Sequence, residues 1–308
     1  MKTLIVLVGP TGVGKTDLSI GLARRCLAPI ISADSRQLYH AIPIGTAAPT
    51  EAELRAVRHY MVGTLELTDY YNAAQYATDA LALLDELFLS HDTVVLTGGS
   101  MLYIDALCYG LDDLPQIAPT LRRELHERFA TEGLEPLADE LQQLDPTYYA
   151  TADVRNPKRV IHALEVCLQT RRPYSELRTA PRAERPFRII RLGLDRPRPE
   201  LYARIDRRVE QMITLGLEQE ARNVYPLRHL NSLNTVGYKE LFDYFDGNTT
   251  RHEAIEKIKQ HSRNYAKRQL TWFRRDKSTT WFHPDQTDEL YAFVEELLPN
   301  RKAEAKSK

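Results

Sequence analysis

The most informative segment of the sequence is Gly9-Pro10-Thr11-Gly12-Val13-Gly14-Lys15-Thr16. It fits the pattern G-x-x-x-x-G-K-[ST] and lies between an apolar run, Leu4 to Val8, and a stretch with apolar residues at helical spacing from Leu18 to Cys26. Such a loop binds phosphate, because its glycines let backbone N–H groups turn inward while the helix N-terminus and the lysine add positive charge. We predict phosphate binding by all eight residues, with the Thr16 hydroxyl as a ligand of Mg²⁺.

The loop alone does not identify the phosphate compound. A nucleotide triphosphatase would normally carry a second apolar strand that ends in an Mg²⁺-binding Asp. The run Val94 to Leu96 continues instead into Thr97-Gly98-Gly99-Ser100, without an acid. Asp195, after the run Ile190 to Leu194, is the one other position that could serve, and a solvated turn residue before Pro197 is the alternative.

The order of apolar runs predicts an α/β fold, a P-loop NTPase-like parallel sheet core with an inserted all-helical domain. The expected strands are Leu4–Val8, Ile30–Ala33, Val94–Thr97, Phe187–Leu194 and Thr280–Phe282. Between the third and fourth, apolar residues recur at helical spacing in three stripes: Leu121/Leu125/Phe129, Leu137/Leu141/Leu144 and Val160/Leu164/Leu168. We therefore assign 1–115 and 188–308 to the catalytic core and 116–187 to the helical insertion.

Composition sets further bounds. The hydrophobic fraction of 43%, the charged fraction of 27% and the net charge of −1 are those of an ordinary soluble protein. Positive charge is nevertheless concentrated between Lys257 and Lys277, where eight Lys and Arg accompany only Asp276, as in a nucleic-acid footprint. The three cysteines are too widely spaced for a metal or disulfide framework, so we expect buried thiols. Short apolar runs and a strand at the N-terminus favour a cytoplasmic protein without a membrane span, and we expect a monomer.

Seven further segments accompany the phosphate loop. In chain order they are Asp34-Ser35-Arg36-Gln37 with Tyr39, Ile44-Gly45-Thr46-Ala47, Gly98-Gly99-Ser100-Met101-Leu102-Tyr103, Asn156-Pro157-Lys158-Arg159, Arg204-Ile205-Asp206-Arg207-Arg208, Val236-Gly237-Tyr238 and Ala266-Lys267-Arg268-Gln269-Leu270-Thr271-Trp272-Phe273-Arg274. In this order and spacing they resemble the tRNA dimethylallyltransferase family over nearly the whole chain. Three positions depart from the family pattern, which usually has Thr in place of Ser100, Gln in place of Lys158 and Arg in place of His162.

The resemblance implies transfer of a dimethylallyl group from dimethylallyl diphosphate to the exocyclic amine of the adenine immediately 3′ of the anticodon in tRNA, giving isopentenyladenosine. It implies Asp34 as the general base, Lys15 and Thr16 with the loop as the diphosphate site, Arg208 as a group that neutralises the departing diphosphate, and Mg²⁺ as the cofactor. The tRNA contacts that it implies are Asp34, Ser35, Arg36, Gln37, Ser100, Arg122, Lys158, Arg159, Val160, Ile161, His162, Asn234, Thr235, Val236, Gly237, Tyr238, Lys239, Lys267, Arg268, Gln269, Trp272 and Arg274.

Elementary chemistry agrees with these roles. The lone pair of an adenine amine is delocalised into the ring, so a carboxylate within hydrogen-bond reach is a sensible requirement. Asp34 follows the second expected strand, and the carboxyl ends of parallel strands line one crevice, so Asp34 and Lys15 should face the same pocket. Taken alone, Asp34 could equally be a helix N-cap. Arg204 and Arg208 are four residues apart and therefore share one helix face, where the alternative is a pair of solvated charges.

Three other functions stay open on the residues alone. A prenyltransferase that acts on free adenine nucleotides would not need a basic insertion or a basic C-terminal helix. A P-loop nucleotide kinase would use ATP, which we expect to bind here only incidentally. A non-catalytic RNA-binding protein with a vestigial loop would not need Lys15, Thr16 and Asp34 together.

Overall fold

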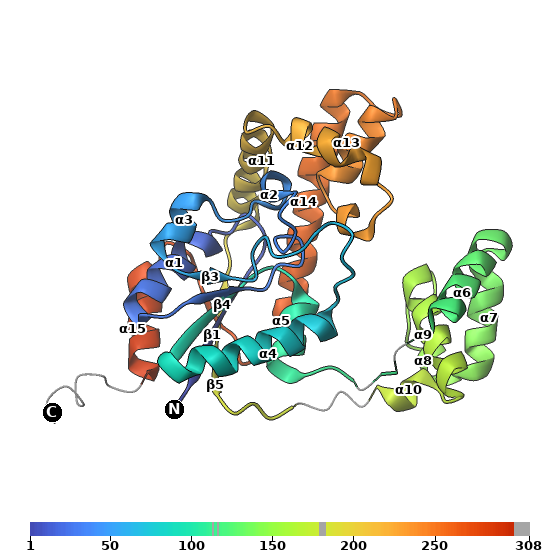
Figure 1. The fold of residues 1–308 in the computed structure, drawn as a ribbon, viewed down its shortest axis with the longest axis horizontal. Helices are drawn as coiled ribbons and strands as arrows, with labels where there is room; N and C mark the ends of the chain where they lie inside the picture. The colour runs from blue at the N-terminus through green and yellow to red at the C-terminus, as the bar shows by residue number, and fades with distance from the viewer. Residues whose placement is uncertain (113, 116, 179–182, 299–308) are drawn as a thin grey trace, which may run out of the picture. The chain divides into compact units, whose positions relative to one another are not determined.

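The computed structural model describes residues 1–112, 114–115, 117–178 and 183–298. Within these residues a six-stranded parallel sheet forms the core, in the strand order β3-β2-β4-β1-β5-β6 (Figure 1). Its strands are β1 Thr3–Val8, β2 Ile30–Ser32, β3 His59–Tyr60, β4 Thr93–Thr97, β5 Arg188–Leu194 and β6 Thr280–Phe282. The five predicted strands are confirmed, each to within one residue at either end. The two-residue β3 was not predicted, because so short an edge strand leaves no periodic pattern.

The register of the central strands explains where the loops meet. β1 lies between β4 and β5, with Ile5 opposite both Val95 and Ile190. All of its residues are buried, as expected for a parallel strand covered on both faces. Since every strand runs in the same direction, the segments that follow β1, β2, β4 and β5 emerge at one edge. The phosphate loop, Asp34, Gly98 and Asp195 therefore belong to the same end of the sheet.

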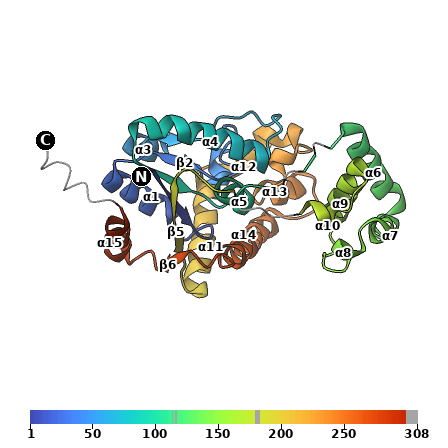
Figure 2. The same cartoon turned by 90° about the horizontal axis from the view of Figure 1, so that it is seen from below.

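Helices cover both faces of the sheet (Figure 2). The side chains of α1 (Lys15–Cys26) and α15 (Thr287–Leu297) share one apolar cluster with alternate residues of β1, such as Ile5 and Leu7. The intervening strand residues point to the other face, which α4 (Ala73–Ser90) and α5 (Met101–Tyr109) cover.

A second apolar cluster lies beyond the strand ends. Its residues come from the segment after β2 and from the helices that follow β5, including Ile42, Val209, Leu217, Tyr238 and Ile258. The elements of this region are α2 Pro43–Thr46, α3 Glu51–Ala56, α11 Arg198–Thr214, α12 Leu217–Val224, the 3₁₀ helices η1 Tyr225–Leu227 and η2 Asn231–Leu233, α13 Tyr238–Phe245 and α14 Arg251–Phe273.

The chain divides into two compact units, one of residues 1–108 and 185–308 and a helical one of residues 109–184. The predicted insertion, 116–187, thus begins seven residues late and ends three late, because the connecting residues carry no periodic pattern. The three predicted stripes lie on α6 (Pro119–Glu132), α7 (Glu135–Leu144) and α9 (Pro157–Thr170) and share one apolar cluster, except for Leu144, which is exposed at the end of α7. The helices of this unit are α6 Pro119–Glu132, α7 Glu135–Leu144, α8 Pro146–Tyr149, α9 Pro157–Thr170 and α10 Tyr174–Leu177.

The structure also bears on the burial of the cysteines and on membrane-spanning helices. Cys26, Cys108 and Cys167 are buried, as predicted. A helix both long and apolar enough to span a bilayer is absent from the described part of the chain.

Candidate active site

The phosphate loop joins β1 to α1 and is held open by its glycines. Gly12 has φ +79°, in the region that glycine alone adopts freely, and a Cβ there would lie 2.8 Å from a side-chain carbon of Ile205. The Lys15 ammonium donates to the carbonyls of Gly9 and Pro10, both at 2.9 Å, and so bends back over the loop. The loop therefore has the shape and the cation that a phosphate group requires.

Three arginines brace the loop from the segment that follows β5. Arg208 donates from Nη1 to the Thr11 hydroxyl at 3.1 Å, and Arg204 donates from Nε to the Gly12 carbonyl at 3.0 Å. Arg196 donates from Nε to the Val13 carbonyl at 3.0 Å. Arg204 and Arg208 lie on one face of α11 as expected, and their contacts exclude the interpretation as merely solvated charges.

Burial and mutual repulsion shift the titration of these cations. The pKa of Lys15 falls from 10.5 to about 7, first because its ammonium is desolvated and second because Arg208 repels it, while Asp34 opposes the change. Desolvation also lowers the pKa of Arg208 from its ordinary value, again opposed by Asp34. Two cations pressed together beside one carboxylate make a site that an anion would stabilise.

Asp34 lies just beyond β2 at the same end of the sheet. Its Oδ1 accepts the Arg36 N–H at 3.0 Å within a turn, and no helix starts there, so it is not a helix N-cap. The next residue is fixed from β4, because the Ser35 N–H donates to Ser100 Oγ at 2.7 Å. Gly98 allows this approach, since a Cβ there would lie 2.2 Å from the Ala33 carbonyl oxygen. The segment after β4 thus fixes the backbone next to the Asp34 carboxylate.

Gln269 of α14 links the phosphate loop to this segment. Its side chain is fully buried, Oε1 accepts the Thr11 N–H at 2.8 Å, and Nε2 donates to the Gly99 carbonyl at 2.9 Å. The Tyr265 hydroxyl donates to the same carbonyl at 3.2 Å. One amide from α14 therefore connects the phosphate loop with the segment that positions Asp34.

A cavity of about 130 Å³ lies where these groups meet. Its polar lining includes Thr11, Asp34 and Arg208. Its apolar lining is supplied by the helices after β5 and by the turn before α13, and comprises Ile205, Val209, Met212, Leu217, Val236 and Ile258. A small apolar group joined to a diphosphate fits such a mixed lining better than a second charged group does.

Several residues predicted to contact tRNA instead bond to the polypeptide. Arg36 donates to the carbonyls of Asn231 and Ser232, both at 3.0 Å, and Gln37 donates to the Ala47 carbonyl at 3.0 Å. Both side chains therefore fix neighbouring turns. Their direct contact with tRNA remains a prediction.

The 234–239 segment and α14 present a mixture of exposed and buried side chains. Tyr238 is fully buried and its hydroxyl donates to Glu220 at 2.5 Å, whereas Asn234 and Lys239 are exposed and Thr235 and Val236 line the cavity. Lys267 and Arg268 on α14, and Arg274 directly after it, are exposed. The Trp272 indole N–H donates to Asp105 at 2.6 Å and Arg275 covers the ring at 4.8 Å, so this aromatic is partly used within the protein.

In the helical unit, α9 presents the predicted cations on its outer face. Lys158, Arg159 and His162 are exposed, while Val160 and Ile161 are buried in the core of the unit and can only support that face.

Arg122 of α6 belongs to the same surface and is held by Glu165, which is buried. Nε of Arg122 donates to Oε1 at 2.9 Å, and His162 lies 3.6 Å from Oε2. Burial would raise the pKa of Glu165, but the hydrogen bonds from His162 and Arg122 prevail and lower it.

The residues that could hold Mg²⁺ are few. Thr16 is exposed at the first turn of α1, which suits a hydroxyl ligand shared with phosphate oxygens and water. Asp195 is less suitable, because Arg274 pairs with its carboxylate and the Arg196 N–H donates to it at 2.9 Å. Among the described residues no group of three or more His, Cys, Asp or Glu gathers as a metal site. A magnesium ion is compatible with this loop only if the diphosphate supplies most of its ligands.

A family model described as IPP transferase matches residues 37–276. The chain belongs to this family. It is 56% identical over 298 residues to "tRNA dimethylallyltransferase 2" of Parabacteroides distasonis, covering 97% of this chain and 100% of the relative, and 59% identical over 292 residues to "tRNA dimethylallyltransferase 1" of Phocaeicola vulgatus, covering 95% and 97%.

Solved structures agree with this IPP transferase assignment. The full-length tRNA isopentenylpyrophosphate transferase of Bacillus halodurans superposes with a TM-score of 0.73 at 34% identity, covering all of both chains. A eukaryotic dimethylallyltransferase, described as acting on tRNA, gives a TM-score of 0.72 at 25% identity, covering 88% of this chain and 70% of that one. The resemblance inferred from the short segments and the predicted fold class are thus confirmed.

Sequence reasoning missed several parts of this IPP transferase site. Arg196 bonds to the loop backbone, Glu165 holds Arg122, and the apolar cavity wall comes from helices distant in sequence. The spacing of Arg204 and Arg208 was a usable signal, whereas an isolated buried Glu or Met carries none before the fold is known.

Proposed function

We propose that this chain transfers a dimethylallyl group from dimethylallyl diphosphate to the exocyclic amine of the adenine immediately 3′ of the anticodon in tRNA. The observation that carries the proposal is the single cavity onto which Thr11 of the phosphate loop, Arg208 and the Asp34 carboxylate all open, beside an apolar wall. The names of the relatives agree with it. Diphosphate, prenyl group and amine would then meet at one point.

The chemistry assigns each group a part. The amine nitrogen attacks the allylic carbon, the bond from that carbon to the diphosphate oxygen breaks, and the amine proton passes to Asp34. Lys15, Arg208 and the loop N–H groups stabilise the charge that develops on the leaving oxygens. The apolar wall, including Val209 and Met212, takes the methyl groups and excludes water from the reacting carbon.

Mg²⁺ belongs to this proposal as a cofactor bound through Thr16 and the diphosphate. When bound it would supply further positive charge to the leaving group. Thr16 would orient the ion, while Lys15 and Arg208 act on the same phosphate oxygens directly.

The acceptor is proposed to be tRNA because each of the two units carries a basic surface. In the sheet unit it consists of Lys267 and Arg268 on α14 and Arg274 directly after it, and in the helical unit of Lys158 and Arg159 on α9. Phosphate contacts of this kind position an RNA without reading its sequence. The adenine must leave its stack to reach Asp34, which is least costly in a loop.

The deciding experiment incubates the protein with dimethylallyl diphosphate, Mg²⁺ and an unmodified anticodon stem-loop, followed by nucleoside mass analysis. We expect isopentenyladenosine from the stem-loop, much less product from AMP, and no requirement for ATP. Equal kcat/KM for AMP and the stem-loop, or an obligatory hydrolysis of ATP, would disprove the proposal.

A further inference from the structure

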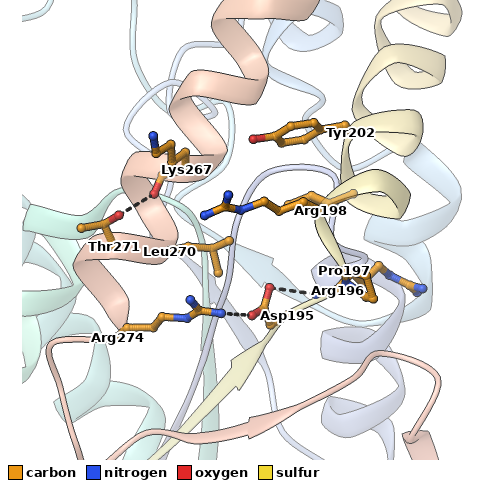
Figure 3. Close-up of a pocket in the computed structure, with 10 residues that line it drawn as sticks. Asp195, Arg196, Pro197, Arg198, Tyr202, Lys267, Leu270, Thr271 and Arg274 are labelled. Carbon is orange, nitrogen blue, oxygen red and sulfur yellow. Dashed lines mark hydrogen bonds and ion pairs between the residues drawn. The ribbon is translucent and has the colours of Figure 1, made fainter.

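A second and larger cavity lies beside the phosphate loop, at the carboxyl end of β5. Its volume is about 390 Å³, and it is enclosed by the start of α11 and the last turns of α14 (Figure 3). Its lining residues are Asp195, Arg196, Pro197, Arg198, Leu201, Tyr202, Lys267, Leu270, Thr271 and Arg274. It shares no residue with the lining of the cavity at Asp34.

The lining is strongly basic. It holds four cationic side chains and one carboxylate. Asp195 is engaged by Arg274, and Arg196 pairs with Glu200 and with Asp285. Positive charge is therefore left in excess, which a bound anion would neutralise.

Arg198 and Lys267 make up that excess. Both are exposed, and in the described part of the chain neither forms an ion pair with an acidic side chain. Figure 3 shows Arg198 and the Tyr202 ring projecting from α11 towards α14, whose Lys267 and Thr271 lie opposite. Two cations and a phenol hydroxyl from facing helices thus border one space.

The remaining lining suits a sugar as well as a phosphate. Leu201 and Leu270 supply an apolar floor, and the Thr271 hydroxyl is already occupied, donating to the Lys267 carbonyl at 3.0 Å. A site of this kind differs from the phosphate loop, whose backbone has positive φ at Gly9, Gly12 and Gly14 and whose Lys15 is desolvated. Exposed side-chain cations without a backbone cradle are typical of contacts to a nucleic-acid backbone.

We propose that this cavity binds a backbone phosphate of the RNA substrate, with Arg198 and Lys267 as its cations and the Tyr202 hydroxyl as a further donor. The inference rests on the proposed function. It adds Arg198 and Tyr202 to the proposed RNA-binding surface, although α11 is distant in sequence from the positively charged segment Lys257 to Lys277. RNA is favoured over a free nucleotide because two lining residues, Lys267 and Arg274, belong to the positively charged segment Lys257 to Lys277.

A charge reversal with a matched control on the same helix tests the proposal. Arg198→Glu should raise the apparent KM for an anticodon stem-loop about 10-fold, the size expected for one charged hydrogen bond, and flatten the salt dependence of binding by roughly one unit of slope. Arg207→Glu makes the same charge change at another exposed position of α11 and should have less than about a twofold effect. The KM for dimethylallyl diphosphate should stay the same in both variants.

A double-mutant cycle tests whether Arg198 and Lys267 contact one phosphate or only add to the positive potential of the surface. Arg198→Ala and Lys267→Ala should be non-additive in stem-loop binding if both contact one phosphate, and Tyr202→Phe should weaken binding about twofold to threefold. Additive effects, or equal effects of Arg198→Glu and Arg207→Glu, would overturn the proposal.

A binding measurement with ATP tests whether the cavity takes the phosphate of a free nucleotide instead. Weaker binding of ATP to Arg198→Ala with unchanged stem-loop binding would assign the cavity to a nucleotide and would also overturn the proposal. Failure of the wild-type protein to prenylate the stem-loop would instead count against the proposed function, so the two failures are distinguishable.

Discussion

The phosphate loop and helix α9 both place cations at the N-terminus of a helix, yet they hold them in opposite ways. Lys15 bends back over its loop beside Arg208 and is desolvated enough to lower its pKa to about 7. Lys158 and Arg159 project from the first turn of α9 into solvent. Crowded, desolvated cations gain most from a small, highly charged group, whereas exposed ones add modestly to the binding of a polyanion.

The largest effect should come from Asp34, the carboxylate proposed to take the proton of the acceptor amine. Asp34→Asn removes the base but keeps the shape, so kcat should fall by about 10²–10⁴-fold while inorganic diphosphate binds almost as before. Single-turnover kinetics with the stem-loop and calorimetry with diphosphate would measure the two. A variant that keeps more than about a tenth of the wild-type rate would rule out Asp34 as the base.

A matched pair of lysines probes the comparison directly. Lys15→Met should weaken diphosphate binding by about 10–100-fold, because a hydrogen bond to a charged group contributes about 1.5–3 kcal/mol. Lys158→Met should change diphosphate binding little and raise the KM for the stem-loop only a few-fold. If the two variants had equal effects on diphosphate binding, the distinction between the half-buried Lys15 and the exposed Lys158 would be lost.

Gln269 offers an effect of intermediate size. Gln269→Leu leaves the Thr11 N–H without its acceptor and the Gly99 carbonyl with the Tyr265 hydroxyl as its remaining donor, which costs about 1–3 kcal/mol in stability. We expect a lower Tm and about a 10-fold lower kcat, since the loop and the Asp34 segment lose their common anchor. Gln260→Leu, at an exposed position of the same helix, is the control. A normal kcat in the Gln269 variant would show that the anchor is not required.

The pH dependence of diphosphate binding sharpens the same point. Because the pKa of Lys15 is about 7 in the folded protein, the ammonium is largely deprotonated at pH 8, and a bound diphosphate should draw a proton back. Affinity should therefore fall between pH 7 and 9, with uptake of up to about one proton in buffers of different ionisation enthalpy.

The free energy of unfolding should depend on pH in the opposite direction. The unfolded chain binds the extra proton between about pH 7 and pH 10.5, so the contribution of Lys15 to stability rises with pH in that window. Lys15→Met should abolish both the proton uptake and this slope; an unchanged uptake would assign the proton to another group.

The smallest effect is expected in the helical unit. Glu165→Gln keeps an acceptor for Arg122 but removes the charge that also attracts His162, so the stem-loop KM should rise a few-fold with the donor KM unchanged. Glu124→Gln, an exposed position on α6, is the control. Restoration of normal KM at low salt would be consistent with looser phosphate contacts; a loss confined to Tm would show a structural role only.

The two regions also differ in how far the sequence predicts them. The glycine loop, the strand before it and the helix after it could be placed because each depends on local backbone geometry, as the positive φ of Gly12 illustrates. The stripes of α6, α7 and α9 were recognisable because burial of one helix face imposes a period. The ends of the helical unit were less well placed, since a connecting segment has no such constraint.

The sequence by itself therefore determined the local features: a phosphate loop, the succession of five strands along the chain, and Asp34 at the end of a strand. The tertiary structure alone decided the partners of these groups. Gln269 reaches Thr11, and Arg208 reaches the same residue, across 258 and 197 positions of chain. The physical reason is that hydrogen bonds between distant residues and the shape of a cavity depend on packing in three dimensions, which leaves no period or spacing in the sequence.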